Sequence, residues 1–124
     1  MLINCTNHPY EIWNEPQREG AKEYGEVVDI PFPEINPKSN SADIRKLVKE
    51  YAERIETKNP DAVLVAGEFT FVFMLVDKLL SDGVTVLSSC SSRITKEVMK
   101  DDGSNEKQSV FLFERFREYD YYKR

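Results

Sequence analysis

The sequence predicts an α/β fold whose parallel sheet has a strand order of about 2-1-3-4, with a C-terminal β-hairpin. Short apolar runs, rich in Val, alternate with amphipathic segments, most clearly in the stretch 61–93. Strands covered on both faces of a parallel sheet appear as continuous apolar runs, and intervening helices make right-handed crossovers between them. The end of the chain differs, because the turn signal Asp102-Gly103 separates two arms of a hairpin.

We predict each element from local signals. A strand spans 1–5, and a turn at 6–9 contains Pro9. A helix follows over 12–24, with a regular part that begins nearer the capping residue Asn14, and a second strand spans 27–30. Buried candidates in this helix are Ile12, Trp13, Ala21 and Tyr24.

The second half continues the alternation. Ser41 is the expected N-cap of a helix over 42–57, a strand spans 62–66, a helix 69–80 and a strand 84–87. A spacing of three and four residues marks the apolar face of the helix 69–80, which comprises Phe69, Val72, Phe73, Val76, Leu79 and Leu80. The hairpin covers about 93–119, either at one sheet edge or against a second subunit, and 120–124 form a frayed tail.

Composition indicates one domain over residues 1–124. Hydrophobic residues make up 40% and charged residues 31% of the chain, as in ordinary soluble proteins. The net charge of −5 argues against non-specific binding of duplex nucleic acid. No apolar run approaches the ~20 residues of a membrane helix, so we expect a cytoplasmic protein without a membrane partner.

The two cysteines, Cys5 and Cys90, fit neither a metal-ligand spacing nor a CxxC motif. The predicted strand order places one strand between them, so we expect free thiols in a reducing compartment. With a single His in the chain, the sequence predicts no metal, and we expect no other cofactor.

Polar residues cluster where the predicted strands end. In open α/β sheets, ligands bind at the carboxyl ends of the strands, at the point where the strand order reverses. That crevice lies between the first and third strands, and a hydroxyl-rich loop at 88–93 closes it. N–H groups at the start of the helix 69–80 favour a phosphate or carboxylate. The candidate residues are Thr6, Asn7, His8, Gly67, Glu68, Phe69, Thr70, Ser91, Ser92 and Arg93.

Most of these residues also have a purely structural interpretation. His8 and Asn7 are plausible caps, Glu68 complements a helix dipole, and Ser91 suits a turn. Arg93 has the clearest functional interpretation, since a cation after a run of serines suits an oxyanion or phosphate.

Four segments carry a resemblance, namely the strand ending in Asn7-His8, the turn Gly67-Glu68-Phe69, the hydroxyl-rich segment ending in Arg93 and the closing segment 113–119. Together they resemble the small Rossmann-like CRISPR-associated (Csx-type) proteins. That group includes ring nucleases, which cleave cyclic oligoadenylate second messengers. The resemblance implies a Rossmann-like, three-layer fold. It also implies metal-independent cleavage of cyclic oligoadenylate, expected to be cyclic tetra-adenylate, through attack by the substrate's 2′-hydroxyl, which leaves a 2′,3′-cyclic phosphate.

On this resemblance, Arg93 stabilises the phosphate charge and His8 acts as general base or acid. Ser91, Ser92 and Thr70 hold phosphate oxygens, while Asn7 and Glu68 contact ribose or adenine. A two-fold symmetric ring suggests a homodimer as its receptor. Two alternatives stay open, a non-catalytic nucleotide sensor and an interaction module whose crevice is filled by its own side chains.

Overall fold

The computed structural model describes residues 1–123, so Arg124, the last residue of the predicted tail, lies outside the described part. One five-stranded sheet has the order β2-β1-β3-β4-β5. Its strands are β1 (Leu2–Cys5), β2 (Val27–Asp29), β3 (Ala62–Val65), β4 (Val86–Met99) and β5 (Asn105–Glu118). The first four strands are parallel and β5 is antiparallel to β4. The predicted order and hairpin are confirmed, although the hairpin makes the sheet mixed rather than fully parallel.

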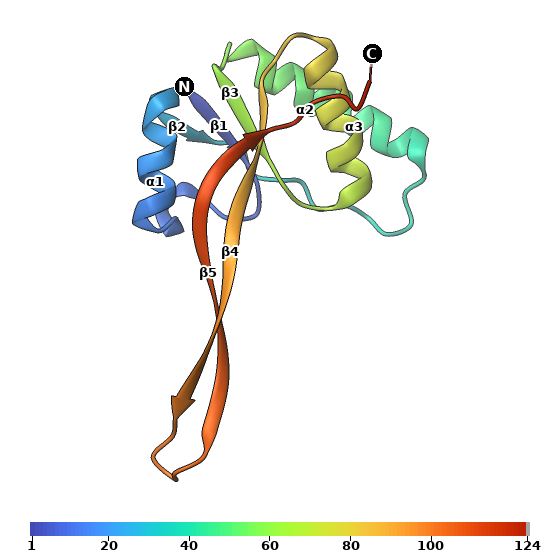
Figure 1. Ribbon diagram of the computed structural model, residues 1–124. Helices are drawn as coiled ribbons and strands as arrows, with labels where there is room; N and C mark the ends of the chain where they lie inside the picture. The colour runs from blue at the N-terminus through green and yellow to red at the C-terminus, as the bar shows by residue number, and fades with distance from the viewer. Residues whose placement is uncertain (124) are drawn as a thin grey trace.

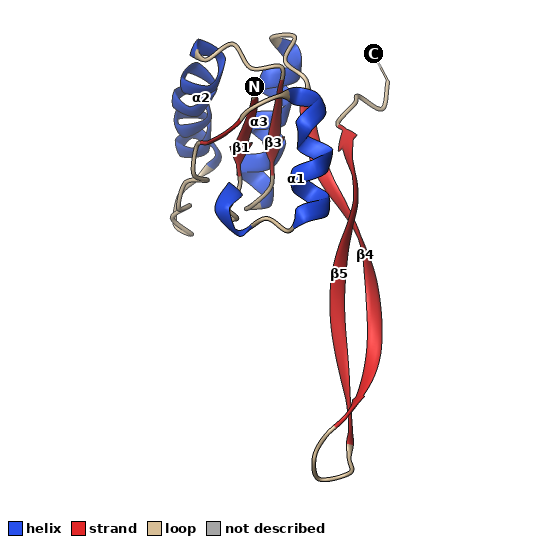
Figure 2. Cartoon of the chain, turned by 90° about the vertical axis from the view of Figure 1, so that its left-hand side faces the viewer, coloured by secondary structure: helices blue, strands red, loops and turns tan. Residues whose placement is uncertain are grey.

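Helices cover both faces of the sheet, which gives three layers (Figure 2). The helix α1 (Glu15–Ala21) packs on one face, and α2 (Ser41–Thr57) and α3 (Phe69–Ser81) pack on the other. Side chains alternate along a strand. Ile3 and Cys5 therefore join the core under α2 and α3, while Leu2 joins the core under α1.

The predicted helix 12–24 is divided into a 3-10 turn (Tyr10–Ile12), α1 and a second 3-10 turn (Lys22–Tyr24). Asn14 caps α1 as predicted, since its side chain accepts a hydrogen bond from the Gln17 N–H. The prediction that Ile12 is buried is wrong, because this residue precedes the cap and is 61% exposed.

The N-cap of α2 is Asn40 and not the predicted Ser41. The Asn40 side chain accepts a hydrogen bond from the Asp43 N–H, and the Asp43 carboxylate accepts one from the Asn40 N–H. This reciprocal pair satisfies two N–H groups that the first turn of a helix leaves without partners, which fixes the start of α2 one residue earlier than expected.

The predicted core face of α3 is only partly right. Val76 and Leu79 are buried, together with Phe71 and Leu75, but Phe69 is 88% exposed and Phe73 is 80% exposed. Apolar residues occur around most of α3, so the spacing alone fits more than one orientation. Packing decides between them. The Phe71 ring contacts Phe32 and Tyr51 edge-on, at centroid distances of 5.1 and 5.7 Å.

The hairpin forms a long arm (Figure 1). In β4, only Val86 and Leu87 pair with β3, whereas pairing with β5 continues to Met99. Because β4 runs parallel to β1 and β3, the arm extends beyond the carboxyl ends of those strands. The predicted loop at 88–93 is therefore wrong, since these residues are part of β4.

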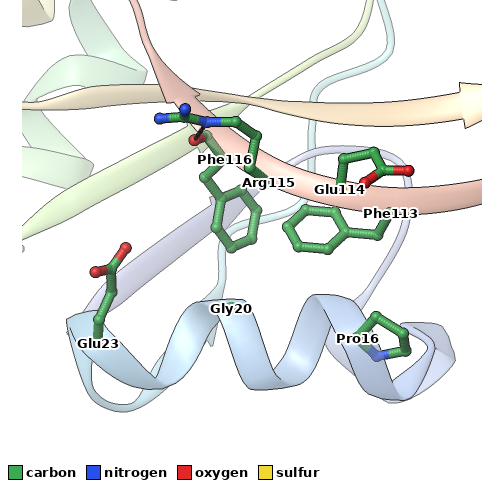
Figure 3. A pocket seen from close by; sticks show the side chains of 7 residues that line it. All are labelled: Pro16, Gly20, Glu23, Phe113, Glu114, Arg115 and Phe116. Atoms are coloured by element: carbon green, nitrogen blue, oxygen red, sulfur yellow. Dashed lines mark hydrogen bonds between the residues drawn. The ribbon is translucent and has the colours of Figure 1, made fainter.

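Aromatic residues of β5 attach the base of the arm to α1 (Figure 3). Phe116 is 7% exposed and contacts Trp13 and Tyr24. The Phe113 ring lies against Gly20, where a β-carbon would be 2.9 Å from Phe113 Cε1. A bulge between Cys90 and Ser91 shifts the register here, and Phe113 and Phe116 both point toward α1 in Figure 3 although they are three residues apart.

Candidate functional site

The turn after β1 is held by hydrogen bonds to the backbone of His8. Its carbonyl oxygen accepts from Asn4 Nδ2 at 2.8 Å, Trp13 Nε1 at 2.9 Å and Thr6 Oγ1 at 3.2 Å. The His8 N–H donates to Thr6 Oγ1 at 3.1 Å. The imidazole itself is exposed, and no hydrogen bond among residues 1–123 engages it. A fixed backbone with an exposed imidazole suits a residue that meets a ligand.

Asn4 is the centre of this polar network. It is 1% exposed, and its Nδ2 also donates to Asp29 Oδ1 at 2.8 Å, while its Oδ1 accepts from Thr6 Oγ1 at 2.8 Å. The Asp29 carboxylate accepts in addition from the Tyr10 N–H, at 3.2 and 3.3 Å. Burial of Asn4 is compatible with stability because its polar atoms have partners. The network ties β1, β2 and the following turn together.

A pocket of about 200 Å³ opens beside this network at the carboxyl ends of β1 and β2. Its lining combines polar groups with an aromatic wall, and consists of Asn4, Thr6, Asn7, Pro9, Asp29, Pro31 and Phe32. The volume is below the ~300–1,000 Å³ of pockets that enclose a drug-sized ligand. It therefore suits one sugar or one base rather than a whole oligonucleotide.

Gly67, predicted as a site residue, lies next to this pocket because Phe32 bridges the two. A β-carbon at Gly67 would be 2.4 Å from Phe32 Cζ. This is closer than carbon atoms approach without displacement, so the close contact requires glycine. The structure thus brings Thr6, Asn7 and Gly67 to one edge of the sheet, as the sequence predicts. The pocket itself, however, lies between the ends of β1 and β2 and not between those of β1 and β3, where the crevice was expected.

The Glu68 side chain occupies the N-terminus of α3. Its carboxylate accepts hydrogen bonds from the N–H groups of Thr70 (3.0 Å) and Phe71 (2.9 Å), and from Thr70 Oγ1 at 2.7 Å. These bonds, the Thr70 hydroxyl first, lower the pKa of Glu68 below its usual value of 4.5. A carboxylate thus already fills the position that the sequence offers to a phosphate. Glu68 is thus the N-cap of α3, and the Thr70 hydroxyl is one of the donors to its carboxylate.

The remaining predicted residues lie on the arm or away from the crevice. Ser92 Oγ donates to Glu114 Oε1 at 2.6 Å, and Arg93 donates to Ser109 Oγ through Nη2 at 3.1 Å. From Leu87 to Arg93 the strand advances by about 20 Å. Ser91 belongs to the same part of β4. Phe69 lines a separate apolar groove of about 560 Å³ between α3 and the segment 119–122.

Five residues of the pocket were not among the predicted site residues, namely Asn4, Pro9, Asp29, Pro31 and Phe32. An asparagine inside the apolar run Met1–Cys5 is the signal that identifies Asn4, because a buried amide requires partners. Phe32 carries no comparable signal, since it lies in a proline-rich loop whose path depends on tertiary packing.

Among residues 1–123, no three His, Cys, Asp or Glu side chains gather closely enough to hold a metal ion. No helix in the same range combines the length and apolar composition needed to cross a membrane.

The fold and the pocket define a class, namely an open α/β sheet with helices on both faces, a polar pocket at the carboxyl ends of its strands, and a projecting β-hairpin. The family model described as "Uncharacterized protein MJ1673 family" matches residues 1–117, and the chain belongs to this family. No curated protein and no solved structure shows significant similarity to the chain.

Proposed function

We propose that the protein is a Rossmann-like, CRISPR-associated ring nuclease that binds cyclic oligoadenylate at the carboxyl edge of β1 and β2. The observation that carries the proposal is the pocket at the carboxyl ends of β1 and β2, whose lining includes Asn7 and Pro9, the two chain neighbours of the exposed His8. Ligand binding at this edge is the general behaviour of open α/β sheets. The choice of cyclic oligoadenylate rests on the resemblance stated for the sequence.

The pocket chemistry favours the nucleoside part of such a ligand over its phosphates. Asp29 and Asn7 supply an acceptor and an amide for ribose hydroxyls or adenine edges, and Phe32 supplies an apolar wall. An anionic phosphate in the pocket would instead meet the carboxylate of Asp29. One nucleoside therefore enters the pocket, and the rest of the ring lies outside it.

Outside the pocket, the ring extends toward the side of the sheet from which the arm emerges. Arg93, on the arm, would neutralise a phosphate there, and Ser91 and Ser92 would hold its oxygens. His8, between the lining residues Asn7 and Pro9 in the chain, would remove a proton from the attacking 2′-hydroxyl or give one to the leaving oxygen. The nucleophile in this reaction is the substrate's own hydroxyl, for which the protein supplies position and charge.

We place the protein in the cytoplasm, where the unpaired thiols of Cys5 and Cys90 stay reduced. A non-catalytic sensor that uses the same pocket is the second candidate. It is favoured by the distance along β4 between the crevice and Arg93, because a site with no cation close to the phosphate lacks the charge stabilisation that speeds cleavage.

Calorimetric titration with cyclic tetra-adenylate and with adenosine monophosphate tests the pocket. Asn7→Ala and His8→Ala each weaken binding about tenfold, the value of one lost hydrogen bond. Lys58→Ala is the matched control, because this exposed residue lies before β3, at the opposite edge of the sheet. Equal affinities for all variants, or binding of neither ligand, would remove the nucleotide from this pocket.

A further inference from the structure

The outer part of the arm has only two strands. Beyond the bulge at Cys90 and Ser91, β4 pairs with β5 and with no other strand of the described residues 1–123, since β3 ends at Val65. A two-stranded ribbon is at best marginally stable in water unless an apolar face is covered. The outer arm therefore needs a surface to pack on.

The register divides the arm into two faces. Directly opposed residues of an antiparallel ladder share a face, and successive residues alternate between faces. One face carries the rows Ser92–Leu112, Ile94–Val110, Lys96–Gln108 and Val98–Glu106. We name it the aliphatic face, after four side chains that are each 37–44% exposed, namely Ile94, Val98, Val110 and Leu112.

Three of these side chains, Leu112, Ile94 and Val110, form an apolar patch between two charged residues, and Val98 lies beyond the second of them, toward the tip. Toward the body, Glu114 belongs to the aliphatic face, since its Oε1 accepts from Ser92 Oγ at 2.6 Å. Toward the tip lies Lys96, for which no ion pair exists among residues 1–123. Glu106, the other acid of this face, already faces Lys100 at 3.9 Å within the same arm.

We propose that the aliphatic face binds the aliphatic face of a second copy of this chain, with the two arms antiparallel. A two-fold axis between the rows Ser92–Leu112 and Ile94–Val110 places Leu112 on the partner's Val110. The same axis brings Glu114 opposite the row that holds the partner's Lys96. The pair occurs twice by symmetry.

Charge complementarity selects a second copy as the occupant. Along this face, an acid, an apolar patch and a base follow one another. When a second arm lies antiparallel to the first, this order is complementary to itself, whereas an unrelated partner would match it only by chance. The dimer forms whether or not a nucleotide binds at the crevice, so each proposal can fail without the other.

Sedimentation velocity from low to high micromolar concentration tests the dimer. Wild-type protein is dimeric, and Ile94→Lys raises the dimer Kd at least about tenfold through lost apolar contact and a buried charge. Thr95→Lys is the matched control, since Thr95 is the next residue, is exposed and lies on the opposite face. Its Kd stays within about twofold of wild type. A wild-type monomer at every concentration, or equal effects of the two lysines, overturns the proposal.

Exchanging the charges of Lys96 and Glu114 distinguishes a loss of the contact between the two arms from a loss of folding. Lys96→Glu and Glu114→Lys each raise the Kd several-fold, and the double variant returns it to the wild-type value. Failure of the double variant to recover contradicts the antiparallel arrangement. Phe73→Ser, in the apolar groove beside α3, leaves the Kd unchanged. If Phe73→Ser dissociates the dimer and Ile94→Lys leaves it intact, the interface lies at α3 instead.

Discussion

The ring of Phe32 lies directly against the α-carbon of Gly67, where a β-carbon would be 2.4 Å from Phe32 Cζ. This contact joins the proline-rich loop after β2 to the turn after β3. Phe32 also forms a wall of the pocket at the end of β1. The shape of the pocket therefore depends on the absence of a side chain at position 67.

Gly67→Ala is expected to lower the free energy of unfolding by about 1–3 kcal/mol, because the new methyl group displaces the Phe32 ring. Gly83→Ala is the matched control. Gly83 also has a positive φ, but a β-carbon added there would meet no atom within 4 Å. Urea unfolding of both variants measures the difference. A smaller loss for Gly67→Ala than for Gly83→Ala would contradict the close contact.

The cap formed by Glu68 predicts a dependence of stability on pH. Hydrogen bonds from Thr70 and Phe71 lower the pKa of Glu68 below 4.5, so the charged form is favoured in the folded state. This contribution is complete above the pKa of the unfolded chain and is lost as the pH falls through the lower pKa of the folded state.

We therefore expect wild type to melt a few degrees above Glu68→Gln at pH 7, and the difference to shrink below about pH 4. Thermal melting across pH measures it. Glu50→Gln, on the exposed face of α2, serves as control and follows wild type. A difference in melting temperature between wild type and Glu68→Gln that stays constant down to the lowest pH would disprove the capping account.

Phe116 anchors the arm to the body, since it is buried against Trp13 and Tyr24. Phe116→Ala should cost about 3–5 kcal/mol of unfolding free energy through the cavity that it leaves. Phe111→Ala, on the same strand at a residue that is 63% exposed, should cost less than about 1 kcal/mol. Chemical unfolding compares the two. Similar losses would mean that the body does not depend on this anchor.

The two thiols should differ in reactivity. Burial raises the pKa of Cys5 to about 12, whereas Cys90 lies half-buried on β4. Since the thiolate is the reactive form, a colorimetric thiol reagent should label one thiol in native protein and two after unfolding. Immediate labelling of both thiols in the native state would show that the core under α2 opens readily.

The strand order was predictable because each strand before the hairpin is an apolar run separated by one helix, and right-handed crossovers leave few arrangements. The side of α3 that faces the core was not predictable from the sequence, since Phe69 and Phe71 both belong to apolar stripes of the same spacing. Only contact of Phe71 with Phe32 and Tyr51 decides between them.

The candidate site was predictable in part for similar reasons. Thr6, Asn7 and Gly67 gather at one edge because parallel strands end there. The serines before Arg93 resemble a loop, since Ser88, Ser89, Ser91 and Ser92 show no apolar alternation that would mark a strand. Asn4 and Asp29 form a pocket through contacts between different strands, which local patterns do not encode.

Incubation of the purified protein with cyclic tetra-adenylate in excess EDTA, followed by chromatography of the products, tests the proposed function most directly. The account predicts linear di-adenylate that ends in a 2′,3′-cyclic phosphate. His8→Ala and Arg93→Ala should each form less of this product. Lys107→Ala is the control, since Lys107 lies on the same face of the arm as Arg93, and it should form as much product as wild type. A ring that stays intact with wild-type protein would contradict the ring nuclease proposal.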